Sequence, residues 1–184
     1  MHIRAWTRAT SIMRFAASSS RPPNVCASAC HVDDFALTPA ERRLFDALNR
    51  RGVRFMVIGL GAALLEGAPV ATQDLDVWFE TAVDLRIPEA AADAGGFWIS
   101  GFGAQPPAFG GAGLERIDVV LTAHGLDAFA VEYDRSIVHD VDAVRLRVLP
   151  LDRIIATKRA TGRAKDLAQL PALEATLLAR TPKP

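Results

Sequence analysis

The chain has 184 residues, of which half are hydrophobic, so it can bury one sizeable core but not several full domains. Lys plus Arg and Asp plus Glu each number 21, which gives a net charge of zero. No global positive field is therefore available to hold nucleic acid non-specifically. No apolar run approaches the ~20 residues that a membrane-spanning helix needs, and we expect a soluble, cytoplasmic protein.

Residues 1–34 have the composition of a tail, with several arginines and serines and no acidic residue before Asp33. We predict a disordered N-terminal extension or an over-long start; a transit peptide, which is also rich in Arg and Ser, is the alternative. Cys26 and Cys30 are the only cysteines, and they lack the further ligands of a zinc site. The folded domain is predicted over residues 35–180.

The first half of this domain reads as helix, strand, turn and helix. Thr38, Pro39 and Glu41 form a capping box that predicts a helix start, with an end near Gly52. An apolar run over residues 54–58 predicts a buried strand, and Gly59 and Gly61 predict a tight turn into a second helix. A further strand is predicted from Gln73 to Phe79.

The second half adds shorter elements. We predict a helix over 87–94, a strand over 97–100, a surface loop over 101–113, a strand through Asp118 and a helix over 126–133. The segments 137–141 and 144–149 predict a hairpin about Asp142 and Ala143. Helices over 151–159 and 164–179 close the domain, with the last expected to be disturbed at Pro171. This mixture predicts an α/β protein (α+β in the broad sense).

Three acids give the strongest chemical signal. Asp74 and Asp76 are two residues apart, so a strand directs both to one face while Leu75 turns to the core. Asp118 lies on another apolar strand. An isolated Asp-x-Asp is most often a solvated edge, but three acids on adjacent strands are typical of a hard oxygen site for Mg²⁺ or Mn²⁺ that also holds substrate phosphates.

The upstream glycines fit the same chemistry. Gly59 and Gly61 would let the backbone approach a polyphosphate, and the helix behind them offers its first amides. Their alternative role is simply to permit a tight turn against the sheet. His124 and His139 have no Cys or Ser placed for a nucleophilic dyad, so neither is predicted to be catalytic.

The order of these parts resembles the minimal nucleotidyltransferases of the DNA polymerase beta-like superfamily, in particular the AbiEii-type toxins and related prokaryotic proteins. The resemblance covers about residues 40–175. It rests on the glycine turn, the motif Thr72-Gln73-Asp74-Leu75-Asp76, the third acid in Arg116-Ile117-Asp118-Val119-Val120, and a closing segment with Lys158 and then Arg163-Ala164-Lys165-Asp166. It implies a small mixed β-sheet with helices mainly on one face.

The resemblance also implies roles for individual residues. Asp74, Asp76 and Asp118 would bind the metal and form the catalytic set, with Asp118 also acting on the acceptor hydroxyl. A further group would bind the nucleotide: Gly59, Gly61, Thr72 and Lys158. Lys165 and Asp166 transfer less clearly, because a Lys-Asp pair at a helix start can serve only to hold the last helix.

Two residues depart from the family pattern. Leu60 stands where a second Gly or a Ser is usual, and Val70 stands where an Arg is frequent. Both departures point toward weaker nucleotide binding, while the three acids are unaffected.

The expected function is metal-dependent transfer of a nucleoside monophosphate from a nucleoside triphosphate, ATP included, to a hydroxyl of an RNA or protein acceptor. By resemblance, such a protein would belong to a toxin–antitoxin or phage-defence pair with a cognate partner protein. The alternative is a non-catalytic module of the same fold that binds a nucleotide or a partner protein. A phosphohydrolase using the same acids is a third hypothesis, which lacks the usual His ligands.

Overall fold

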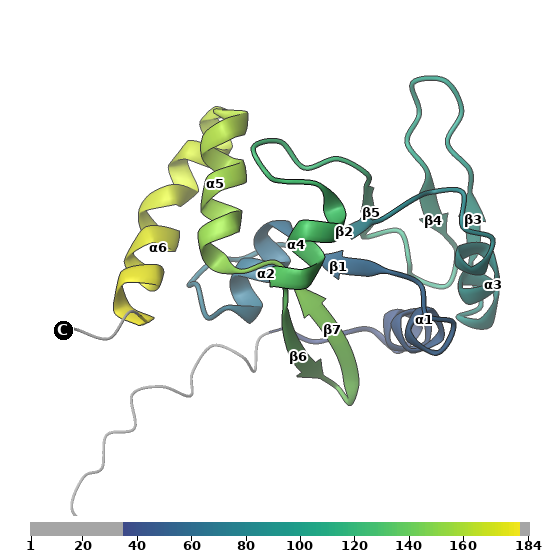
Figure 1. Ribbon diagram of the computed structural model, residues 1–184. Coiled ribbons are helices and arrows are strands. Elements are labelled where there is room, and N and C mark those ends of the chain that lie inside the picture. Colours follow the sequence, from purple (N-terminus) through teal and green to yellow (C-terminus); the bar gives the residue numbers. More distant parts are fainter. Residues whose placement is uncertain (1–34, 181–184) are drawn as a thin grey trace, which may run out of the picture.

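The computed structural model describes residues 35–180, and the predictions for the N-terminal tail and the two cysteines lie outside them. The elements are α1 (Pro39–Arg50), β1 (Phe55–Val57), α2 (Gly59–Leu65), β2 (Leu75–Phe79), α3 (Arg86–Asp93), β3 (Phe97–Ile99), β4 (Ala108–Gly110), β5 (Ile117–Val120), α4 (Phe129–Arg135), β6 (Ile137–Val141), β7 (Val144–Val148), α5 (Leu151–Thr161) and α6 (Ala164–Arg180). Figure 1 shows their arrangement.

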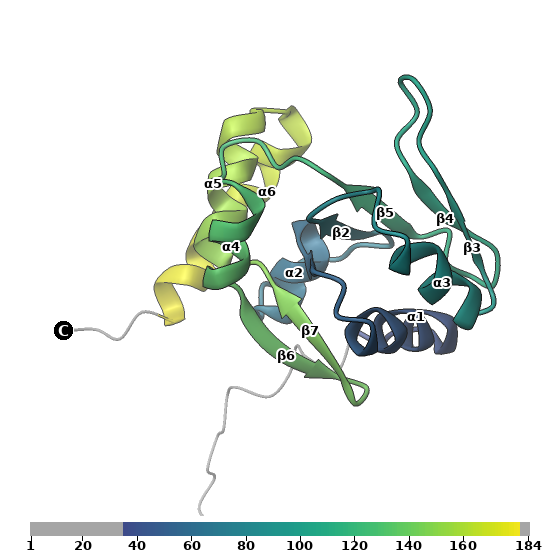
Figure 2. The same cartoon turned by 45° about the vertical axis from the view of Figure 1, so that its right-hand side comes forward.

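A mixed five-stranded sheet organises the domain, with the order β5-β2-β1-β7-β6. β1 runs antiparallel to β2 and parallel to β7, whereas β2 and β5 are parallel. The smaller pair β3 and β4 forms a separate two-stranded sheet that projects to one side (Figures 1 and 2). The predicted α/β class is thus confirmed.

The helices gather mainly on one face of the sheet. Phe55 of β1 stacks on Phe45 of α1, with ring centroids 5.5 Å apart. On the same face, Leu75 of β2 meets Gly61 of α2, and α3 packs against α1 and β3. Alternation along β2 sends Trp78 to the opposite face, where α4 covers it through an edge-on contact with Phe129. The rest of that second face is free to carry polar groups, and Asp76 lies on it.

The last two helices form one end of the molecule. α5 packs against α2 and α6, and both views show the α5–α6 pair on the far side of the sheet from β3 and β4. In α5 the buried positions Leu151, Ile154, Ile155 and Lys158 follow helical spacing. Three of these are core residues; the fourth is a buried cation.

Most predicted elements are present, with one correction in the segment predicted as a loop. The capping box at Thr38 is formed, because its hydroxyl accepts from the Glu41 amide and the Glu41 carboxylate accepts from the Thr38 amide. The predicted loop over 101–113 instead contains β4, whose Phe109 is buried against Trp98. The last helix includes Pro171 within its bounds, and Leu173 just beyond it is buried in the core.

Within residues 35–180, no helix combines the length and the apolar character needed to cross a bilayer.

Candidate active site

The end of β1 and the beginnings of β2 and β5 meet at one place. Because β1 and β2 are antiparallel, the residues after Val57 lie beside the start of β2, and the Ile58 amide donates to the Asp76 carbonyl at 2.9 Å. Because β2 and β5 are parallel, Asp76 and Asp118 are direct partners across the two strands. Sequence segments 60 residues apart are thereby assembled at one corner of the sheet.

Gly59 lies directly against the Asp76 carboxylate. Its φ is +66°, a left-handed conformation that glycine adopts without strain. A methyl group on Gly59 would lie 2.0 Å from Oδ2 of Asp76 and 2.8 Å from its Cγ. Glycine is thus required at this position for two reasons, the backbone conformation and the close approach of an acid.

The other two predicted acids, Asp74 and Asp118, lie near Asp76. Asp76 is half-buried, Asp74 and Asp118 are exposed, and β2 begins at Leu75, so Asp74 precedes the strand instead of lying within it. Burial raises the pKa of the Asp76 carboxyl, and the negative charges of Asp118 and Asp74 raise it further. Lys158 and Lys165 act on the same pKa in the opposite direction. Both other acids are therefore close enough to interact with Asp76.

The carboxylates of Asp74, Asp76 and Asp118 do not form a tight group in this structure. Among residues 35–180, no three His, Cys, Asp or Glu side chains are grouped tightly enough to form a metal site. Three like charges repel when nothing neutralises them. The donor type and the direct pairing of Asp76 with Asp118 fit a Mg²⁺ or Mn²⁺ ion, which takes carboxylate oxygens from neighbouring strands.

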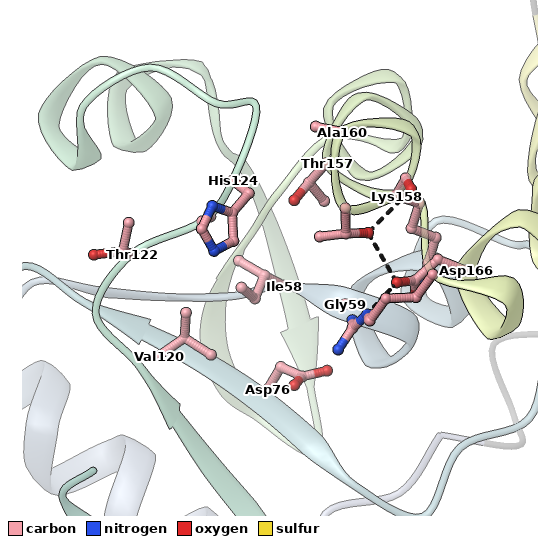
Figure 3. Close-up of a pocket in the computed structure, with 13 residues that line it drawn as sticks. Ile58, Gly59, Asp76, Val120, Thr122, His124, Thr157, Lys158, Ala160 and Asp166 are labelled. Carbon is pink, nitrogen blue, oxygen red and sulfur yellow. Dashed lines mark hydrogen bonds and ion pairs between the residues drawn. The ribbon is translucent and has the colours of Figure 1, made fainter. Parts of the chain in front are cut away.

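A cavity of about 580 Å³ opens beside Asp76 (Figure 3). This volume lies within the range of small-molecule sites. Its walls come from the β1–α2 junction, β2, β5 with the loop after it, and α5 with the start of α6. The lining residues are Ile58, Gly59, Asp76, Val120, Thr122, Ala123, His124, Thr157, Lys158, Ala160, Thr161, Arg163 and Asp166.

Lys158 and Asp166 form a buried ion pair in the wall made by α5 and α6. The Lys158 Nζ lies 3.1 Å from Oδ1 of Asp166. The second oxygen, Oδ2, accepts from Arg163 Nε at 2.6 Å and from the Thr161 hydroxyl at 2.8 Å. Burial alone would raise the pKa of Asp166, but these hydrogen bonds outweigh it and lower the pKa to about 2.

Gly59, Asp76, Lys158 and Asp166 are thus brought together around one cavity, whereas Gly61 and Thr72 do not line it. Gly61 is buried, and a methyl group there would meet Leu75 Cδ1 at 2.9 Å, so it packs the helix onto the sheet. The Thr72 hydroxyl accepts from the Asp74 amide and donates to the Asp74 carbonyl, which fixes the turn before β2. Val70 packs against the hydrophobic core.

Several cavity residues were not predicted from the sequence. His124 and Thr122 come from the loop between β5 and α4, and Thr157, Thr161 and Arg163 come from α5 and the turn after it. Thr161 lies about one helical turn after Lys158 on α5, a spacing that could have indicated it. His124 carried no local signal, because α5, which forms the facing wall of the cavity, is distant in sequence.

Comparison with known proteins gives structural matches only. The sequence matches no protein family profile and no curated protein sequence. The antibiotic-resistance factor ANT(2'')-Ia, in its solution structure, is similar with a TM-score of 0.53 and 14% identity over 75% of this chain and 82% of that one. An antigenic nucleotidyltransferase-like protein from Paracoccidioides brasiliensis is similar with a TM-score of 0.50 and 17% identity over 77% and 75% of the two chains.

The chain has the nucleotidyltransferase fold. At these identities the likeness concerns the arrangement of helices and strands, and the predicted mixed sheet with helices mainly on one face is confirmed by it.

Proposed function

We propose that this protein is a metal-dependent nucleotidyltransferase, which moves a nucleoside monophosphate from a nucleoside triphosphate to a hydroxyl group. The observation that carries the proposal is the position of Asp76. Its carboxylate lies between the glycine turn at Gly59 and the paired strand residue Asp118, at the wall of a cavity that also contains Lys158.

In the proposed reaction the acceptor hydroxyl oxygen attacks the α-phosphorus. A new P–O bond forms, the bond between the α-phosphorus and the bridging oxygen breaks, and pyrophosphate leaves with that electron pair. We assign the hydroxyl proton to the Asp118 carboxylate, which is exposed and therefore accessible to an acceptor. Bound Mg²⁺ or Mn²⁺, held by Asp76 and Asp118 with Asp74 beside them, would neutralise phosphate charge and lower the pKa of the hydroxyl.

Lys158 and Gly59 would hold the phosphates. The ammonium of Lys158 supplies positive charge near Asp76, and Gly59, which lines the cavity beside Asp76, adds backbone with no side chain of its own. Thr72 contributes indirectly, because its hydroxyl fixes the backbone at Asp74. Gly61 supports the turn from beneath through its contact with Leu75.

For the acceptor we propose a hydroxyl of an RNA or a protein. The described domain is small, and a macromolecule can bring its hydroxyl to an exposed Asp118 without a dedicated small-molecule domain. A toxin–antitoxin or phage-defence role with a cognate protein is the biological setting that the family resemblance suggests for such an activity.

The test is transfer of label from each α-labelled nucleoside triphosphate, with Mg²⁺ or Mn²⁺, to a mixture of cellular RNA and protein. We expect label in a macromolecule with the wild type and none with the Asp74→Ala, Asp76→Ala double variant. Asp140→Ala, which removes an exposed acid on β6, is the matched control and should remain active. Loss of label after ribonuclease or after protease treatment then identifies the acceptor. Equal labelling by the wild type and the double variant would overturn the proposal.

One observation favours a second candidate, a non-catalytic module that binds a nucleotide or a partner protein. Leu60 places a bulky side chain directly after Gly59 in the glycine turn, where the family pattern has a Gly or a Ser. Nucleotide binding in calorimetry without any label transfer, under every metal tested, would select this candidate.

A further inference from the structure

The cavity beside Asp76 has two chemically different ends. Figure 3 shows Lys158 and Asp166 together on one side of the cavity and His124, Thr122 and Val120 on the other, with Ile58 between them. The first side is rich in formal charge, because Arg163 also bonds to Asp166 there. The other side offers an imidazole, a hydroxyl and aliphatic carbon.

The uncharged side is a preformed wall, because its loop is packed tightly on α5. Gly125 follows His124 and has a φ of +75°. A methyl group on Gly125 would lie only 2.3 Å from the Cβ of Ala160. This close approach holds the loop that carries His124 against α5, and Thr157, one helical turn before Ala160, lines the same cavity as His124.

The side chains of this wall suit a flat heteroaromatic ring. An imidazole ring provides a stacking surface for a nucleobase, and Ile58 and Val120 provide apolar contact to its other parts. Thr157 is half-buried and its hydroxyl can donate to or accept from the polar edge of a base. The aliphatic carbon of Ile58 and Val120 offers a polyphosphate no compensation for its lost hydration, whereas the opposite side with Lys158 and Gly59 supplies positive charge and open backbone.

We propose that His124 and Thr157 form the base-binding end of this cavity. In this arrangement the nucleobase stacks on His124, Thr157 reads one polar group of its edge, and the phosphates extend toward Gly59, Asp76 and Lys158. The inference rests on the proposed function, since it names the end at which the nucleoside part of that substrate binds. His124 and Thr157 are then the residues that set preference among nucleotides.

The test compares nucleotides with a ligand that has phosphates but no base. Binding of each of the four ribonucleoside triphosphates and of inorganic triphosphate, all with Mg²⁺, is measured by calorimetry for the wild type, His124→Ala, His124→Phe and Thr157→Val. His124→Ala removes the stacking partner. It should lower the affinity for the preferred nucleotide about tenfold and leave the affinity for inorganic triphosphate unchanged. His124→Phe keeps a stacking surface and should retain most of the affinity.

The other variants sharpen the result. Thr157→Val keeps the shape but removes the hydroxyl, so it should reduce the ratio of affinities between preferred and other nucleotides. Thr176→Val, which removes a hydroxyl on α6 that bonds to the Ala172 carbonyl outside the cavity, is the control and should leave this ratio intact. Thermal unfolding of every variant verifies that each is folded.

Two failures are distinguishable. If the wild type binds none of the triphosphates, the proposed function fails and the inference falls with it. The wild type could instead bind nucleotides while His124→Ala lowers the affinities for nucleotide and inorganic triphosphate equally, or lowers neither affinity. In that case the base-binding assignment is wrong and the proposed function stands.

Discussion

The Cα of Gly59 lies so close to the carboxylate of Asp76 that a methyl group at Gly59 would overlap Oδ2, at 2.0 Å. The turn after β1 and the acid of β2 are therefore mutually dependent. The turn fixes where the carboxylate can lie, and the carboxylate restricts residue 59 to glycine. This contact joins the phosphate-binding and metal-binding parts of the proposed site.

We predict that Gly59→Ala removes nucleotidyl transfer while the protein remains folded. Displacing the Asp76 carboxylate by about 1 Å or more should lower the rate of label transfer by ~100-fold or more. Gly67→Ala is a matched control, because Gly67 also has a positive φ, +79°, but nothing lies within 4 Å of the added methyl. Both variants should lose about 1–2 kcal/mol of unfolding free energy from backbone strain, measured by urea denaturation.

The control separates strain from the loss of the site. Gly67→Ala should keep wild-type transfer despite its lower stability. Equal transfer rates in the two variants would show that the contact between Gly59 and Asp76 has no part in the activity.

We predict that Asp118→Asn increases the stability of the metal-free protein and weakens metal binding. Asp76 and Asp118 are direct partners on parallel strands, and like charges in that relationship are destabilising. Removing one charge should raise the urea midpoint slightly in EDTA. Mn²⁺ affinity, measured by calorimetry, should fall at least about tenfold. Loss of a residue that only supports a metal ligand already has an effect of that size.

An Asp118→Asn variant that binds Mn²⁺ as tightly as the wild type would exclude Asp118 as a metal ligand. Addition of Mg²⁺ should raise the wild-type midpoint more than that of the variant, because the ion relieves the same repulsion.

We predict that the ion pair between Lys158 and Asp166 stabilises the folded protein at neutral pH and that this stabilisation is lost in acid. The pKa of Asp166 is lowered from the ordinary value of 3.8 to about 2 in the folded state. The contribution is therefore fully present above pH 3.8, falls as the pH decreases between 3.8 and 2, and is lost below 2. Its size is about 2 kcal/mol. Urea denaturation at a series of pH values should show this decline in the wild type and a shallower one in Asp166→Asn.

Asp166→Asn should also be less stable than the wild type at pH 7, because Lys158 remains buried without its charged partner. Parallel stability curves for the two proteins between pH 4 and pH 2 would contradict the account of this pair.

We predict that Gly125→Ala loosens the loop that carries His124 and that Ala160→Gly restores it. A methyl at Gly125 would meet the Ala160 Cβ at 2.3 Å, so removing that Cβ makes room for it. Gly125→Ala should destabilise the protein by about 1–3 kcal/mol through overpacking and the positive φ. The double variant should recover part of this loss, less the ~1 kcal/mol that glycine costs in a helix. Additive effects of the two changes in urea denaturation would exclude the direct contact.

Local signals in the sequence were sufficient for much of the fold. The capping box at Thr38, the glycine turn at Gly59 and the hairpin about Asp142 and Ala143 each depend on neighbours within a few residues. Both hairpin turn residues adopt positive φ, +50° and +66°, which matches a tight two-residue turn. β4 was missed because its Ala108 and Gly110 lack strand propensity, and only its long-range pairing with β3 makes it a strand.

For the site, the sequence indicated the charged side of the cavity but not the other. Asp76, Gly59 and Lys158 each belong to a motif with a chemical meaning of its own. His124 and Thr157 do not, because they lie far apart in the sequence and meet at one cavity only in the folded chain, where Gly125 packs on Ala160. The sequence allowed two roles for Gly61, approach of the backbone to a phosphate or a tight turn packed against the sheet. Its burial against Leu75 agrees with the second role.

The most direct test of nucleotidyl transfer at this site is to follow α-labelled and γ-labelled forms of the same nucleoside triphosphate in parallel reactions with RNA or protein acceptor and Mg²⁺. Attack at the α-phosphorus predicts that α-label enters the acceptor and that γ-label appears only in pyrophosphate, with both signals lost in Asp76→Asn. Entry of γ-label into the acceptor, or release of γ-label as inorganic phosphate, would contradict the reaction proposed for Asp76 and Asp118.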